Sequence, residues 1–125
     1  VIGLQTDEFP AFYSRSSGLR LPEGARAESV AEAAAMVKAK WDMGLTGGAV
    51  IAAPIPAEAA LPADEIDAAI DRALVAAEAQ GVKGKAVTPF LLAKVAELTG
   101  GHSLKANIAL RENNARVAAE VAAAL

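Results

Sequence analysis

The sequence contains no cysteine, and aromatic residues make up only 4% of it. Without cysteine the chain has neither a disulfide framework nor a thiolate nucleophile, which fits a protein of the reducing cytoplasm. No apolar run approaches the roughly 20 residues that span a bilayer, so no membrane partner is expected. Basic residues are scattered among acidic ones at a net charge of −3, and they form no stripe that would indicate a nucleic-acid partner.

Histidine is almost absent too, because His102 is the single one. It follows two glycines, and no serine or cysteine nucleophile motif accompanies it, so we expect a solvated loop residue rather than a general base. The acidic cluster Asp64, Glu65 and Asp67 is better explained by the start of a helix than by paired carboxylates for glycoside chemistry.

The 125 residues, 54% of them hydrophobic, are enough for one domain with a core. Strand-like runs occupy Val1–Leu4 and Ala49–Ala53. The missing initiator Met and the start inside a strand favour a chain that lacks its beginning. A stable sheet generally needs about three strands, so we expect further strands from outside the chain and an unpaired edge beside Val1–Leu4.

Helical patterns fill most of the remaining chain. A capping box begins at Ser29, and helical spacing continues to Trp41, which we expect to be buried, before a stop at Gly44. A second helix follows Asp64 and ends at Gly81, with an apolar face that we expect to hold Ile66, Ala69, Ile70, Ala73 and Leu74.

Two more helices are predicted in the C-terminal part. Thr88 followed by Pro89 fits the N-cap and first position of a helix that Gly100-Gly101 ends. A last helix starts near Ser103, again read as a cap, and runs toward Leu125. The order of strands and helices indicates an α/β layered protein with a helical C-terminal flank.

The last helix carries the most informative polar residues. Asn107, Arg111 and Asn114 are spaced i, i+4, i+7 and therefore share one face. An asparagine amide donates and accepts, so it can read the mixed edge of a uracil-like base without a change of charge. Alternatively, Asn113 and Asn114 cap or bridge neighbouring loops. Thr88 is either a simple cap or part of a helix N-terminus that binds a phosphate or carbonyl.

A series of ordered motifs extends along almost the whole chain. They are Thr6-Asp7-Glu8-Phe9-Pro10-Ala11-Phe12-Tyr13, Ser17-Gly18, Lys40-Trp41, Gly44-Leu45, Gly47-Gly48, Pro54-Ile55-Pro56, Gly84-Lys85, Thr88-Pro89-Phe90-Leu91-Leu92, Leu98-Thr99-Gly100-Gly101, Ser103-Leu104, Asn107-Ile108 and Asn113-Asn114. Together they resemble the pseudouridine-5'-phosphate glycosidases, also called the indigoidine-synthase-A-like family.

The resemblance implies an α/β/α enzyme, usually a homotrimer, that splits pseudouridine 5'-phosphate into uracil and ribose 5-phosphate with the help of manganese. In that family a lysine forms a covalent adduct with the ring-opened ribose, a glutamate donates a proton and an aspartate holds the hydrated metal. An iminium supplies the electron sink that cleavage of a C–C bond needs. These groups belong to the family's N-terminal half, so the resemblance assigns no catalytic residue and no metal ligand to this chain.

Residues 1–125 are then expected to form the C-terminal portion of a single α/β domain that is inactive alone. The asparagine of the Ser-Leu-x-x-Asn motif carries over onto Asn107 as a residue on the uracil side of the pocket, with Asn113, Asn114 and Thr88 as further pocket candidates. Two positions depart from the family pattern: Ala53 replaces an asparagine before Pro-Ile-Pro, and Arg111 replaces an apolar residue. The alternative interpretation is a stand-alone, non-catalytic α/β oligomerisation module.

Overall fold

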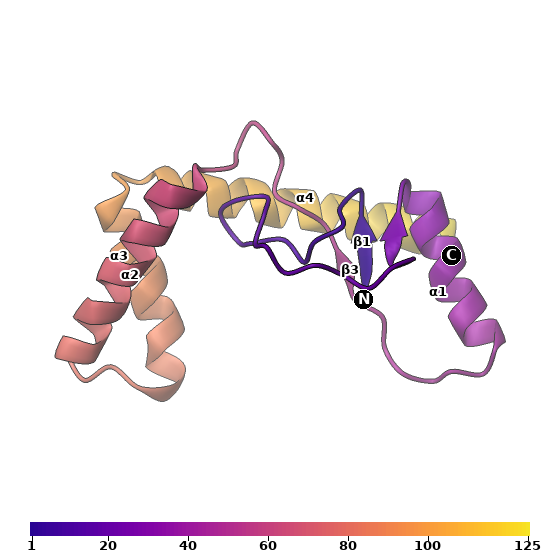
Figure 1. Cartoon of the computed structure of the whole chain (residues 1–125), viewed down its shortest axis with the longest axis horizontal. Helices are drawn as coiled ribbons and strands as arrows, with labels where there is room; N and C mark the ends of the chain where they lie inside the picture. The colour runs from indigo at the N-terminus through magenta and orange to yellow at the C-terminus, as the bar shows by residue number, and fades with distance from the viewer.

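The computed structural model describes all 125 residues, and one long helix joins its two regions (Figure 1). The sheet region lies at one end and a helical region at the other. In chain order the elements are β1 (Ile2–Leu4), β2 (Arg26–Ala27), α1 (Val30–Asp42), β3 (Ile51–Ala52), α2 (Ala63–Ala79), the short 3₁₀ helix η1 (Gly84–Ala86), α3 (Val87–Leu98) and α4 (His102–Ala124). None of the helices is both long and apolar enough to cross a membrane.

The sheet region is built on a central strand, β1. The strand order is β2-β1-β3, and both pairings are parallel, with Gly3 opposite Arg26 on one side and Ala52 on the other. The expected unpaired edge beside Val1–Leu4 is therefore wrong, because β1 has a neighbour on each side. The edges are β2 and β3, and the two-residue β2 was missed because its Arg-Ala sequence carries no strand signal.

Helices cover one face of this sheet. Ile2 and Leu4 point to that face and are buried with residues of α1 and of the C-terminal half of α4. On the opposite face the loop after β1 approaches so closely that a Cβ on Gly3 would lie 2.6 Å from Leu21 Cδ1. The α/β class predicted from the sequence is confirmed, with a helical layer on one side and a loop on the other.

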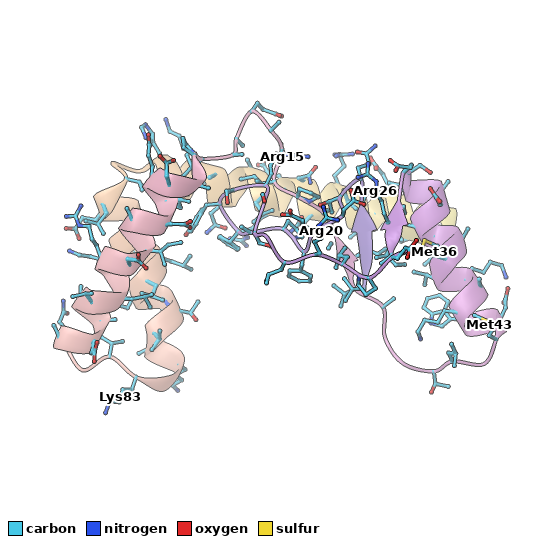
Figure 2. All side chains as sticks on the ribbon, in the orientation of Figure 1. Arg15, Arg20, Arg26, Met36, Met43 and Lys83 are labelled. Atoms are coloured by element: carbon cyan, nitrogen blue, oxygen red, sulfur yellow. The ribbon has the colours of Figure 1, made fainter.

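The Ser29 cap predicted at the start of α1 is present, but Glu32 reaches back to Glu28 rather than to Ser29, so the reciprocal bond of the capping box is shifted by one residue. Ser29 Oγ accepts from the Glu32 N–H at 3.1 Å, and Glu32 Oε2 accepts from the Glu28 N–H at 2.7 Å. Trp41 is 51% exposed, so its predicted burial is wrong. The residues of α1 that contact the sheet and α4 are Ala33, Ala34 and Val37, and Trp41 lies in the part of the helix beyond them. Met43, just past the end of α1, is exposed as well (Figure 2).

The helical region packs α2, α3 and the first half of α4 around its own core. Ile66, Ala69 and Ala73 of α2 are buried there with Val95 of α3. Leu74 was placed on the same apolar face, but it is 47% exposed. The buried face of α2 continues from Ala73 to Ala77 instead, and Leu74 points away from α3 and α4.

The predicted caps of the last two helices are also wrong. The N-cap of α3 is Ala86, so Thr88 lies inside the first turn, and the N-cap of α4 is Gly101 at a φ of 87°. Ser103 lies inside α4, where its N–H donates to Thr99 Oγ1 at 3.1 Å. His102 is exposed as predicted, but as the first residue of α4 rather than in a loop.

Candidate functional site

A cavity of about 550 Å³ lies between the segment after β1 and the three helices of the helical region. Aromatic and aliphatic side chains make most of its wall, and a few polar groups interrupt it. Such a composition and size are typical of small-molecule sites. The lining residues are Ala11, Phe12, Tyr13, Ser14, Ile66, Asp67, Ile70, Thr88, Leu91, Leu92, Val95, Asn107 and Arg111.

Asn107 is the polar residue of this cavity whose bonding is incomplete. The side chain is half-buried on α4, and its Oδ1 is buried without a hydrogen-bond partner. A buried acceptor without a partner destabilises a fold by about 1–3 kcal/mol. The acceptor capacity of this oxygen is therefore unused within the chain.

Thr88 and Arg111 lie beside Asn107 in the same cavity. Thr88 makes no capping hydrogen bond at the start of α3, so its hydroxyl is not used to hold the helix end. Arg111 comes one turn after Asn107 on α4, is exposed, and forms none of the ion pairs of the molecule. The sequence pattern that placed Asn107 and Arg111 on one face agrees with this arrangement.

Two aromatic rings form part of the cavity wall. Phe12 and Tyr13 pack edge to face with ring centroids 4.8 Å apart. Tyr13 is buried, and burial raises the pKa of its hydroxyl above the ordinary value of 10.0, so the ring stays neutral at physiological pH. The sequence places both residues in a longer motif but indicates no role for them, because their contact with α2 and α4 arises only in the folded chain.

The other two asparagine candidates lie elsewhere. Asn113 Nδ2 donates to the Pro54 carbonyl at 3.4 Å, and its Oδ1 accepts from Arg116 at 2.7 Å. This agrees with the alternative in which Asn113 bridges to a neighbouring loop. Asn114 faces a separate apolar groove beside β3. Neither residue lines the cavity that holds Asn107 and Thr88.

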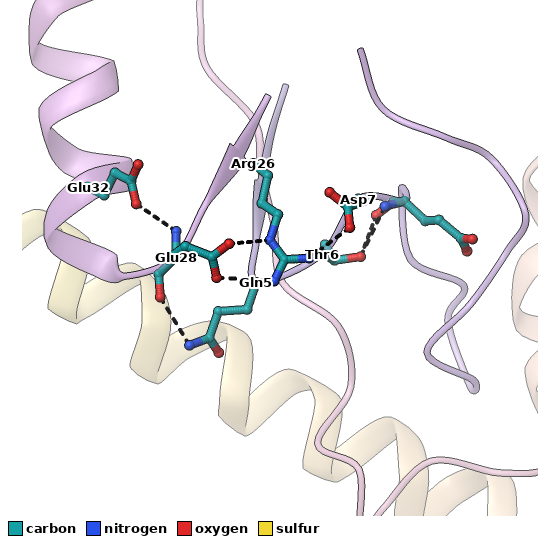
Figure 3. A network of polar contacts seen from close by, with 7 residues as sticks. Gln5, Thr6, Asp7, Arg26, Glu28 and Glu32 are labelled. Carbon is teal, nitrogen blue, oxygen red and sulfur yellow. Dashed lines mark hydrogen bonds and ion pairs between the residues drawn. The ribbon is translucent and has the colours of Figure 1, made fainter. Parts of the chain in front are cut away.

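The carboxylates near the strand ends form hydrogen bonds and ion pairs with other groups of the chain. Arg26 donates to Asp7 at 2.8 Å and to Glu28 at 2.6 Å (Figure 3). Glu8 accepts from the Ser16 hydroxyl at 2.6 Å and from the Gly18 N–H at 3.1 Å, which lowers the pKa of its carboxyl. Nowhere do three or more His, Cys, Asp or Glu side chains gather closely enough to hold a metal ion.

Comparison with known proteins agrees with the sequence motifs. The model of the indigoidine synthase A like protein family matches residues 1–124. The chain belongs to this family.

Among its curated relatives, the pseudouridine-5'-phosphate glycosidase of Solibacter usitatus is 55% identical over 122 residues, which cover 98% of this chain and 40% of the relative. The pseudouridine-5'-phosphate glycosidase of Escherichia coli is 53% identical over 122 residues, which cover 98% of this chain and 38% of the relative. The chain therefore spans about two fifths of the length of the curated relatives it matches.

Two solved structures are similar to this chain along almost its whole length. The prealnumycin C-glycosynthase AlnA, in complex with ribulose 5-phosphate, is 32% identical with a TM-score of 0.84, and the match covers 99% of this chain and 40% of AlnA. The indigoidine synthase A like protein of Thermotoga maritima is 43% identical with a TM-score of 0.79, and the match covers 97% of this chain and 39% of that protein. The arrangement of elements in this family member is thus the one its relatives adopt.

Proposed function

We propose that this chain forms the base-facing part of the substrate pocket of a pseudouridine-5'-phosphate glycosidase. The observation that carries the proposal is Asn107, which lines a mainly apolar cavity and whose Oδ1 has no hydrogen-bond partner within the chain. The names of the curated relatives support the choice of substrate. The products would be uracil and ribose 5-phosphate, and a homotrimer in the cytoplasm belongs to the same proposal.

A uracil ring suits this cavity for two reasons. Its flat faces match the apolar wall formed by Phe12, Tyr13 and Leu91. Its edge alternates N–H donors with carbonyl acceptors, so the Asn107 Oδ1 accepts from a ring N–H while its Nδ2 donates to a ring carbonyl. The neutral amide makes these bonds without a charge that would need to be desolvated.

The bond-breaking chemistry is assigned to residues outside this chain. The side chains present do not fit the manganese ion that the resemblance implies, since no group of three potential ligands lies together. What this chain does in the reaction is to bind and orient the base and to exclude water from its apolar faces.

The test is a complete enzyme in which this chain is joined to the part of the Solibacter usitatus relative that it does not match. Uracil release from pseudouridine 5'-phosphate is followed with manganese present. Replacing Asn107 with alanine leaves a ring edge unsatisfied, which costs about 1–3 kcal/mol and lowers kcat/KM by roughly 5- to 150-fold. The chain alone should release no uracil.

The matched control is Lys105→Ala, an exposed position on the same helix that lies outside the cavity. It should leave kcat/KM unchanged. If Asn107→Ala has full kcat/KM and the same stability as the unsubstituted enzyme, Asn107 does not bind the base and the proposal is wrong.

A further inference from the structure

The cavity that holds Asn107 also has two charged side chains in its wall, Asp67 of α2 and Arg111 of α4. All the other lining residues are apolar or carry a neutral polar group. Both charged residues are exposed, and neither takes part in any ion pair of the structure. The cavity therefore presents one positive charge that no anion of the chain neutralises.

The α4 helix itself gives Arg111 no structural partner. The positions three and four residues away, which are its neighbours on the helix surface, hold Asn107, Ile108, Asn114 and Ala115. None of these residues is acidic. Arg111 also lies far from the last turn of α4, where the helix dipole would favour a positive charge. Nothing in the fold of the chain requires a cation at this position.

Arg111 and Asn107 are placed to contact the same occupant of the cavity. They are one helical turn apart, a spacing at which Cβ atoms are about 5–6 Å from each other. Side chains of a helix lean toward its N-terminus, so the Arg111 side chain extends over the turn that holds Asn107. A ring that bonds to the Asn107 amide therefore has one edge within reach of the guanidinium. The ribose separates the 5'-phosphate of a nucleotide from that edge.

A bound ring changes the surroundings of the guanidinium. Arginine keeps its charge at every physiological pH, and a ring that fills the cavity displaces water from it. Losing that water is costly unless the ring supplies an acceptor. A neutral carbonyl supplies one oxygen, whereas a carboxylate accepts two parallel N–H bonds, each about twice as strong as a bond between neutral groups.

We propose that Arg111 makes the base pocket selective for a uracil-like ring that carries a carboxylate beside the edge bound by Asn107. This inference rests on the proposed function, because it takes the cavity to be the base pocket. Asp67 repels a carboxylate, so the acidic group of the ring lies on the Arg111 side of the cavity. The substrate class is then a nucleotide with an acidic base, of which pseudouridine 5'-phosphate is the neutral parent.

The experiment uses the complete enzyme in which this chain is joined to the unmatched part of the Solibacter usitatus relative. Isothermal titration calorimetry at pH 7 measures the binding of three free bases. They are uracil, orotate, which is uracil with a carboxylate on the ring, and orotamide, the uncharged carboxamide of the same shape. Orotate should bind about tenfold more tightly than orotamide, because only orotate forms the charged pair with Arg111.

Two substitutions of Arg111 test the origin of this preference. Arg111→Met removes the charge but keeps a long side chain against the cavity wall, and it should abolish the preference for orotate over orotamide. Arg111→Lys keeps the charge without the planar fork, so it should restore only part of the preference. The matched control is Lys105→Met, which removes the same unit charge from an exposed position of α4 outside the cavity and should keep the full preference.

The outcomes distinguish this inference from the proposed function. If none of the three bases binds, or if Asn107→Ala binds uracil as tightly as the unsubstituted enzyme, the cavity is not the base pocket and both proposals are wrong. If Asn107→Ala weakens uracil binding but orotate and orotamide bind equally, only the inference about Arg111 is wrong. The same conclusion follows if Arg111→Met keeps the preference, or if Lys105→Met removes it as well.

Discussion

The helical region and the sheet region differ in how their buried residues are grouped. In the helical region Ile55, Ile66 and Val95 are almost wholly buried in one cluster of 8 residues. The sheet region has two smaller clusters of 4 buried residues each, one containing Ile2 and the other Leu4. The two regions share α4, which contributes to the large cluster with its first half and to the Leu4 cluster with its second half.

The reason for the difference lies in the hydrogen bonding of the backbone. A helix satisfies its peptide groups internally, so three helices can close a core with no further partner. A strand depends on its neighbours, and a sheet of three short strands leaves two edges. The comparison teaches that the helices of the helical region pair their peptide groups within this chain, whereas the β3 side of the sheet region is open.

The largest effect is expected in the core of the helical region. Ile66→Ala removes a side chain that is 2% exposed and leaves a cavity, which should lower the free energy of unfolding by about 2–5 kcal/mol. Urea denaturation followed by circular dichroism measures the change. Val75→Ala, at a position 68% exposed on the same helix, should stay within about 0.5 kcal/mol. Equal effects at the two positions would show that this core is not tightly packed.

A smaller loss is expected from crowding the loop side of the sheet. In Gly3→Ala the new Cβ would overlap the Thr6 carbonyl oxygen and lie 2.6 Å from Leu21 Cδ1. Overpacking of this kind lowers the free energy of unfolding by about 1–3 kcal/mol. Gly48→Ala is the control, because a Cβ there meets no atom within 4 Å. If Gly3→Ala is as stable as Gly48→Ala, the loop does not cover this face of the sheet.

The capping of α1 allows a third test, since α1 is the only α-helix whose N-cap side chain accepts a hydrogen bond from the first turn. Ser29→Ala removes the bond to the Glu32 N–H and should destabilise the chain by about 1 kcal/mol. Hydrogen exchange should show the loss in the sheet region. Thr88→Ala is the comparison in the helical region, and it should leave stability unchanged because Thr88 caps nothing. The reverse order of effects would contradict the cap assignment.

The smallest effect concerns acid stability through Glu8. Hydrogen bonds from Ser16 and Gly18 lower the pKa of the Glu8 carboxyl below its ordinary value of 4.5. A lowered folded pKa means that the stabilisation is complete above pH 4.5 and is lost as the pH falls through the folded value. Urea midpoints measured from pH 6 to pH 3 should fall less steeply in Glu8→Gln than in the unsubstituted chain. Parallel curves would contradict a role for Glu8.

Local patterns predicted helices well and their contacts poorly. The spacing of apolar residues and the Ser29 box placed α1 close to its observed bounds, and Asp64 and Glu65 marked the start of α2. Trp41 and Leu74 were nevertheless predicted to be buried, whereas both are exposed. Periodicity shows which residues share a face, but it does not show where the neighbouring element ends.

Part of the candidate site was also predictable. Asn107 was singled out by its position on a helix face and by its family motif, and its unpartnered Oδ1 is consistent with that choice. Asn114 was grouped with it by the i, i+7 spacing, and Asn113 by the Asn113-Asn114 motif. Asn114 lies about two turns further along α4 and lines the groove beside β3, while Asn113 lines a third pocket.

The sequence by itself determined the α/β class, the main helices and the family, because these depend on local spacing and on ordered motifs. Only the tertiary structure decided that β1 is the central strand, that Thr88 and Asn107 line one cavity, and that β3 is an edge strand. Each of these depends on contacts between residues far apart in the chain. Such contacts follow from how the strands and helices pack together, and no local pattern records them.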